Sequence, residues 1–121
     1  MIALVVDDSA AMRRIQQKAL EGLGWQVEVA NSGGDALAKL GTLEHCDLML
    51  TDWHMPGMDG LDLIVAVRKD IRHKTLRIVM VTSDSVLDSV EKALAAGADD
   101  FVMKPFTTDA LSERLFKVMR A

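Results

Sequence analysis

Short apolar runs alternate with longer segments of helical spacing along the 121 residues of the chain. The runs are rich in aliphatic side chains, and most are continuously apolar, as is typical of strands buried on both faces of a sheet. The five runs are Ile2–Val6, Trp25–Val29, Leu48–Thr51, Leu76–Thr82 and Phe101–Met103. Because each crossover between parallel strands is right-handed, strict alternation predicts a parallel sheet with helices on both faces.

The segments between and after the runs predict five helices. In the first of them, the spacing places an apolar stripe at Ala11, Ile15, Ala19 and Leu23. Five strand–helix units are too few for an eight-stranded barrel, so an open sheet remains. We therefore expect an α/β fold with one domain, residues 1–121, built on a doubly wound five-stranded parallel sheet. Its expected strand order is 2-1-3-4-5, as in flavodoxin-like folds.

The composition excludes several classes of protein. The chain is 50% hydrophobic, which is too apolar for disorder, yet no apolar run approaches the roughly 20 residues of a membrane span. The first apolar run is short and lacks a basic start, so we expect no signal peptide. A lone cysteine favours a reducing compartment, and the net charge of −4 argues against nucleic-acid binding. We expect a cytoplasmic protein without membrane or nucleic-acid partners.

Acidic residues follow two of the predicted strands. Asp7 and Asp8 come directly after the first strand, and Asp52 follows the third. In the expected order these strands are neighbours, roughly 4.8 Å apart, and ligands of such sheets bind beyond the carboxyl ends of the strands. Three carboxylates that lie close together repel one another unless a cation is present. Carboxylate oxygens with room for water and a phosphate indicate Mg²⁺.

Further polar side chains follow the remaining strands at the same edge. Thr82 ends the fourth run, Ser83 is next, and Lys104 follows the fifth run. Each residue alone is more often a turn, cap or surface residue, but their joint occurrence favours a site. Carboxylates, a metal ion, a hydroxyl and an ammonium group suit phosphoryl transfer, in which a carboxylate can be the nucleophile.

These motifs resemble the receiver domain of response regulators over essentially the whole chain. The matching residues are Asp7-Asp8, Asp52, Thr82-Ser83 and Lys104-Pro105-Phe106, and the segments Met12–Ile15 and Asp52–Gly60 are also similar. The resemblance implies a phosphorelay receiver that takes a phosphoryl group from a sensor histidine kinase or phosphotransfer protein. It implies that Asp52 is the phosphoacceptor. Mg²⁺ would be held by Asp8 and Asp52 directly, by Asp7 largely through water, and by the backbone carbonyl of His54.

The resemblance also implies a switch that signals to a downstream output protein. Lys104 would pair with phosphoryl oxygens, Thr82 would donate its hydroxyl to them, and Ser83 would keep access open. Phe101 would then rotate inward, and Pro105 would follow a cis peptide bond. The output face would comprise the fourth helix, fifth strand and fifth helix, while the first helix and the loop after the fifth strand would receive the kinase. We expect a monomer that catalyses only its own phosphorylation and slow autodephosphorylation.

Four residues near the expected acceptor need separate interpretation. His54 stands where chemotaxis members of the family carry Asn, and we hypothesise that His54 and Asp84 set the lifetime of the phosphate. Phe101 lacks the hydroxyl of a tyrosine, so recognition by the output protein should differ from that in chemotaxis. We expect Trp53 to be partly exposed beside the site.

Other readings remain open from the sequence. The same domain could belong to a longer regulator, such as a DNA-binding transcription factor or a hybrid kinase. An aspartyl-nucleophile phosphatase is a second reading, although such enzymes usually carry a second Asp two residues after the nucleophile, whereas Asp7 and Asp8 are adjacent. A flavodoxin-like cofactor binder is a third, but Asp7-Asp8-Ser9 would repel a phosphate unless a cation intervened.

Overall fold

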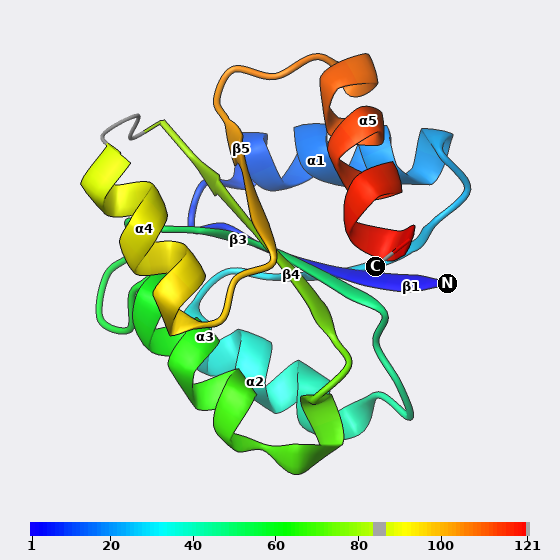
Figure 1. Cartoon of the computed structure of the whole chain (residues 1–121). Coiled ribbons are helices and arrows are strands. Elements are labelled where there is room, and N and C mark those ends of the chain that lie inside the picture. Colours follow the sequence, from blue (N-terminus) through cyan, green and yellow to red (C-terminus); the bar gives the residue numbers. More distant parts are fainter. Residues whose placement is uncertain (84–86, 121) are drawn as a thin grey trace.

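The computed structural model describes residues 1–83 and 87–120. Five parallel strands form one sheet in the order β2-β1-β3-β4-β5. Figure 1 shows α1 and α5 on one face of the sheet and α2, α3 and α4 on the other. The elements are β1 (Ile2–Val6), α1 (Ala10–Gly22), β2 (Gln26–Ala30), α2 (Gly33–Thr42), β3 (Leu48–Asp52), α3 (Gly60–Lys69), a 3-10 turn (Ile71–His73), β4 (Arg77–Thr82), α4 (Leu87–Ala96), β5 (Asp100–Met103) and α5 (Thr108–Arg120).

The sheet confirms the predicted architecture. All five predicted strands are present within one residue at either end, and the strand order is the expected one. The register pairs Val6 with Thr51, Asp52 with Val81, and Thr82 with Met103. The carboxyl ends of β1, β3, β4 and β5 therefore meet at one edge, where the loops carry the predicted site residues.

Each face of the sheet has its own apolar cluster. Buried side chains of α2, α3 and α4 pack with β1, β3 and β4 on one face. On the other face, α1 and α5 contribute Leu20, Leu111, Leu115 and Val118. Among the described residues, no helix is long and apolar enough to cross a membrane.

The buried face of α1 differs from the predicted stripe. Ile15 is 52% exposed and Leu23 is 39% exposed, whereas Gln16 and Leu20 are fully buried. The helix turns Gln16 inwards because its side-chain amide donates a hydrogen bond to buried Asp7. A stripe chosen by apolarity alone could not include this polar residue.

The turn between β3 and α3 brings the backbone close to itself. Asp59 caps α3 by accepting from Asp62 N at 2.8 Å, and Asp62 Oδ2 accepts in return from Asp59 N. Gly60 N then donates to the Trp53 carbonyl at 2.7 Å. A Cβ on Gly60 would lie 2.2 Å from the carbonyl oxygen of Asp52. Gly60 thus allows α3 to begin directly against the end of β3.

Replacing Gly60 with alanine should therefore disturb both stability and the position of Asp52. We expect Gly60→Ala to lower the free energy of unfolding in urea by roughly 1–3 kcal/mol, because the clash is with backbone. Gly34→Ala is the control, since Gly34 lies in α2 with open space around its Cα. That change should raise stability by up to about 1 kcal/mol. Equal effects of the two substitutions would contradict this account of the turn.

Candidate functional site

Three carboxylates gather at the carboxyl edge of the sheet. Asp7 and Asp8 follow β1, Asp52 ends β3, and one oxygen of each lies within 4.8 Å of the others. Asp7 is fully buried, the Asp52 side chain is 14% exposed, and Asp8 is exposed to solvent. The predicted cluster is therefore present, with one side open to solvent.

The Lys104 ammonium lies between two of these carboxylates. Its Nζ is 3.1 Å from Asp7 Oδ2 and 3.3 Å from Asp52 Oδ2, and its side chain is only 15% exposed. The Lys104 backbone N–H donates to the carbonyl of Thr82 at 2.8 Å, which links the ends of β4 and β5. The Lys104–Pro105 peptide bond is cis, as the resemblance implied. Lys104 thus supplies positive charge where the carboxylates need it.

Protein donors fix the orientation of Asp7. Its Oδ1 accepts from Ser9 N at 2.9 Å, and its Oδ2 accepts from Gln16 Nε2 at 3.2 Å in addition to Lys104. The Arg13 guanidinium donates to the Asp7 backbone carbonyl at 2.8 Å. The N-cap of α1 and a residue in the middle of the helix therefore hold this carboxylate by both oxygens.

The environment of Asp52 raises the pKa of its carboxyl group. Burial is the main cause, and the negative charge of Asp7 adds to it. The positive charge of Lys104 opposes the shift, as does the hydrogen bond that Trp53 N donates to Asp52 Oδ1 at 2.8 Å. The ionised form of Asp52 is thus less favoured than in an exposed aspartate, and the pKa is raised overall.

The donor set of the cluster fits a hard divalent cation. Carboxylate oxygens are the ligands that Mg²⁺ prefers, and the exposed side of Asp8 leaves room for the water that Mg²⁺ usually retains. A cation would also replace Lys104 as the charge that compensates Asp7 and Asp52. The coordinating role of the His54 carbonyl stays a prediction.

The structure places the other predicted residues around the same edge. Thr82 is buried at 2% exposure, and Ser83 is exposed directly after it. Phe101 is half-buried on β5, with the Arg114 guanidinium 5.4 Å from its ring centre. Asp84 lies outside the described residues.

The two aromatic side chains after Asp52 stack on each other. The Trp53 and His54 ring centres are 5.9 Å apart, with 21° between the planes. His54 is exposed, but Trp53 is only 8% exposed, so the expectation of a partly exposed tryptophan is wrong. The indole packs into the cluster beneath α2, α3 and α4, where its large apolar area is removed from water.

One neighbour of the cluster was missed by sequence reasoning. Gln16 is nine residues beyond Asp7 and belongs to no motif that we singled out. Its helical position on the same face as Leu20 was the available signal, but a glutamine on a helix normally faces solvent.

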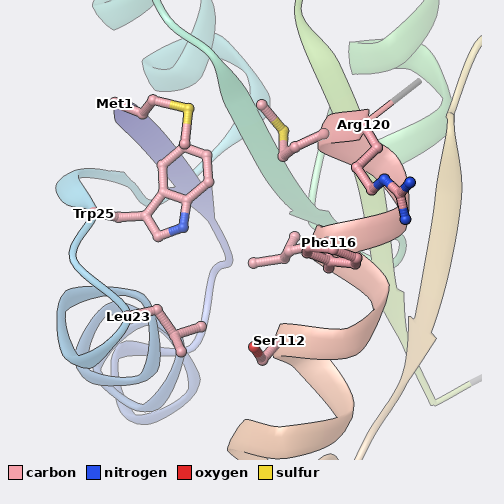
Figure 2. A pocket seen from close by; sticks show the side chains of 8 residues that line it. Met1, Leu23, Trp25, Ser112, Phe116 and Arg120 are labelled. Carbon is pink, nitrogen blue, oxygen red and sulfur yellow. The ribbon is translucent and has the colours of Figure 1, made fainter.

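A cavity of about 280 Å³ lies away from the carboxylates. Met1, which precedes β1, and Leu23 and Trp25 line one side of it, and α5 lines the other (Figure 2). The α5 residues include Ser112, Phe116 and Arg120, whose guanidinium lies 5.0 Å from the Phe116 ring centre. This cavity borders the start of β1, so it takes no part in the candidate site.

Comparisons with known proteins agree with one another. Residues 3–116 match the model of the response regulator receiver domain. The chain is 42% identical over 120 residues to the chemotaxis protein CheY1 of Helicobacter pylori, covering 98% of this chain and 97% of that protein. The solved structure of Vibrio cholerae CheY4 has a TM-score of 0.91 and 32% identity, with 97% of each chain covered. A probable two-component system response regulator/GGDEF domain protein has a TM-score of 0.93 and 29% identity, with 99% of this chain but 49% of that one covered.

The raised pKa of Asp52 predicts how stability depends on pH. The folded state binds this proton more tightly than the unfolded chain, whose carboxyl has the ordinary value of 3.8, so stability falls as the pH rises from there through the folded pKa. Asp52→Asn removes the titrating carboxyl group and therefore this loss of stability at higher pH. In a chelating buffer at neutral pH, the variant should have a higher Tm than the wild type.

The difference in Tm should shrink as the pH falls towards the ordinary carboxyl value, because Asp52 is then protonated in both states. Thermal unfolding followed by circular dichroism measures it. A lower Tm for Asp52→Asn at neutral pH would contradict the assigned direction of the shift.

Proposed function

Because the chain belongs to the response-regulator receiver-domain family, as a CheY-like member in two-component signalling, we propose that Asp52 accepts a phosphoryl group. The observation that carries this proposal is the position of Lys104. Its ammonium is 3.3 Å from an Asp52 oxygen, so it can also reach a phosphoryl group attached there. We propose that residues 1–121 form one receiver domain that acts as a cytoplasmic monomer.

The proposed chemistry is transfer of a phosphoryl group from a phosphohistidine. An Asp52 carboxylate oxygen attacks phosphorus, the P–N bond breaks, and an aspartyl phosphate forms. The histidine ring retains the electron pair of the broken bond. Mg²⁺ bound by Asp7, Asp8, Asp52 and the His54 carbonyl would supply charge neutralisation. Lys104 favours the ionised form of Asp52 before the reaction and binds phosphoryl oxygens after it.

The proposed switch begins with the new charge. A phosphoryl group adds nearly two negative charges and three strong acceptors next to Lys104 and Thr82. These residues are already linked by the hydrogen bond that Lys104 N donates to the Thr82 carbonyl, so movement of one residue affects the position of the other. Inward rotation of Phe101 follows from movement of Thr82, with Ser83 leaving space at the acceptor. The face formed by α4, β5 and α5 then presents a changed surface to an output protein.

Two surfaces fit the proposed partners. A hollow of about 410 Å³ lies between α1 and the loop after β5, lined by Ile15, Lys18, Ala19, Gly22, Phe106 and Thr108. We assign it to the histidine kinase or phosphotransfer protein, since exposed Ile15 offers an apolar anchor. A second hollow, on the output face, is lined in part by Phe101, Pro105 and Arg114.

A longer regulator is the second candidate. One solved relative joins a receiver of this fold to further sequence, since this chain covers 49% of it. In such a protein the same phosphorylation would act on an attached module, for example that of a transcription factor or hybrid kinase.

Phosphorylation can be tested with a small-molecule phosphodonor and intact-mass spectrometry. We expect one added phosphoryl group that is labile to acid and base, that requires Mg²⁺, and that Asp52→Ala abolishes. Glu113→Gln, which removes an exposed carboxylate on α5, should retain phosphorylation and serves as the control. Phosphorylation that persists in Asp52→Ala would reject the proposed acceptor. Turnover of many donor molecules without an Asp52 adduct would favour a phosphatase.

His54 tests the proposed control of phosphate lifetime. Its exposed ring, two residues after Asp52 in the sequence, stacks on Trp53, and we propose that His54 and Asp84 regulate the lifetime of the phosphoryl group. His54→Asn should change the first-order rate of autodephosphorylation severalfold. His45→Asn, before β3 at the opposite edge of the sheet, should leave the rate unchanged. An unaltered rate in His54→Asn would reject this role.

A further inference from the structure

Gln16 is a buried polar residue whose two side-chain atoms differ in their surroundings. The residue is fully buried on α1. Its Nε2 donates to Asp7 Oδ2 at 3.2 Å. Its Oε1 is buried as well and has no hydrogen-bond partner among the described residues. Gln16 therefore makes one polar contact with the carboxylate cluster and leaves one acceptor unsatisfied.

An unsatisfied buried oxygen is unfavourable for folding. A methionine side chain has a similar length and would fill the same space without burying a polar atom. The amide cannot relieve the problem by turning over, because Oε1 would then lie against the Asp7 carboxylate. Folding stability alone thus does not explain why a glutamine occupies this position. The hydrogen bond that Gln16 donates to Asp7 does explain it.

Gln16 donates this hydrogen bond to Oδ2 of Asp7, the oxygen that Lys104 also contacts. Ser9 N holds Oδ1, while Oδ2 is shared between Gln16 and Lys104. When Lys104 turns to another anion, Oδ2 would lose its charged partner and Asp7 could rotate. Gln16 keeps a donor on Oδ2, so the carboxylate stays fixed by α1 at both oxygens.

We propose that Gln16 is a positioning residue that holds Asp7 in the orientation needed to bind Mg²⁺. This inference rests on the proposed function, because it assumes that the carboxylate cluster binds the cation. Partners that orient metal ligands commonly change metal affinity by 10–100-fold when they are removed. Gln16 acts on the cation only through Asp7.

The test compares two glutamine substitutions on the same helix. In Gln16→Met we expect the Kd for Mg²⁺, measured by intrinsic tryptophan fluorescence, to rise about tenfold. Its Tm in a chelating buffer should change little, since removal of the unsatisfied oxygen offsets the loss of the hydrogen bond to Asp7. Gln17→Met is the control, because Gln17 Nε2 bonds only weakly to exposed Glu21, at 3.4 Å. Its Kd should match the wild type.

Unchanged Mg²⁺ affinity in Gln16→Met would overturn the proposal. If the Tm of this variant were also lowered, Gln16 would have a purely structural role. If the wild type binds no Mg²⁺ and Asp52 is not phosphorylated, the proposed function fails and this inference fails with it. If the wild type binds Mg²⁺ and is phosphorylated while Gln16→Met binds equally well, only this inference fails.

A measurement on the wild type covers the case in which Gln16→Met does not fold. The chain has three glutamines, Gln16, Gln17 and Gln26, so their side-chain amide resonances can be assigned by NMR. We expect Mg²⁺ to shift the Gln16 amide and to leave those of Gln17 and Gln26 in place. A Gln16 amide that does not respond to Mg²⁺ would overturn the proposal.

Discussion

The rest of the site depends on the contact of one ammonium group with two carboxylates. Lys104 comes from the loop after β5, yet its Nζ lies within 3.3 Å of oxygens on both Asp7 and Asp52, beyond the neighbouring strand β4. Without positive charge between them, two acidic groups this close together and this deeply buried would repel each other strongly. The parallel sheet makes the contact possible because its strands end at one edge.

The same contact joins the proposed acceptor to the expected output face. The Lys104 backbone donates a hydrogen bond to Thr82, and its side chain forms an ion pair with Asp52, the proposed acceptor. Any group that binds at Asp52 and draws the ammonium away therefore acts on the ends of β4 and β5 together. Burial raises the pKa of Asp52, whereas a nucleophile must be ionised. Lys104 opposes this shift without cancelling it, and a bound cation would favour the ionised form further.

Much of the architecture could be predicted from the sequence, because apolar runs, and the residues that directly follow them, can be recognised from the local sequence alone. Asp7, Asp8 and Asp52 could be placed at one edge once the runs were interpreted as parallel strands. The burial of Gln16 and Trp53 could not be predicted, because each depends on a specific tertiary partner. Gln16 contacts the Asp7 carboxylate, and Trp53 packs into the apolar cluster beneath α2–α4. The contacts of Lys104 with carboxylates could not be predicted either, because they depend on distances between side chains in the folded protein.

The central claim is that this carboxylate cluster is a cation site whose charge is compensated by Lys104 until a cation binds. Isothermal titration calorimetry with Mg²⁺, in two buffers with different heats of ionisation, tests it directly. Because the pKa of Asp52 is raised and the cation binds the ionised carboxylate, binding should release protons, and their number should change with pH through the range where Asp52 titrates. Absence of Mg²⁺ binding, or binding whose proton release does not depend on pH, would contradict the claim.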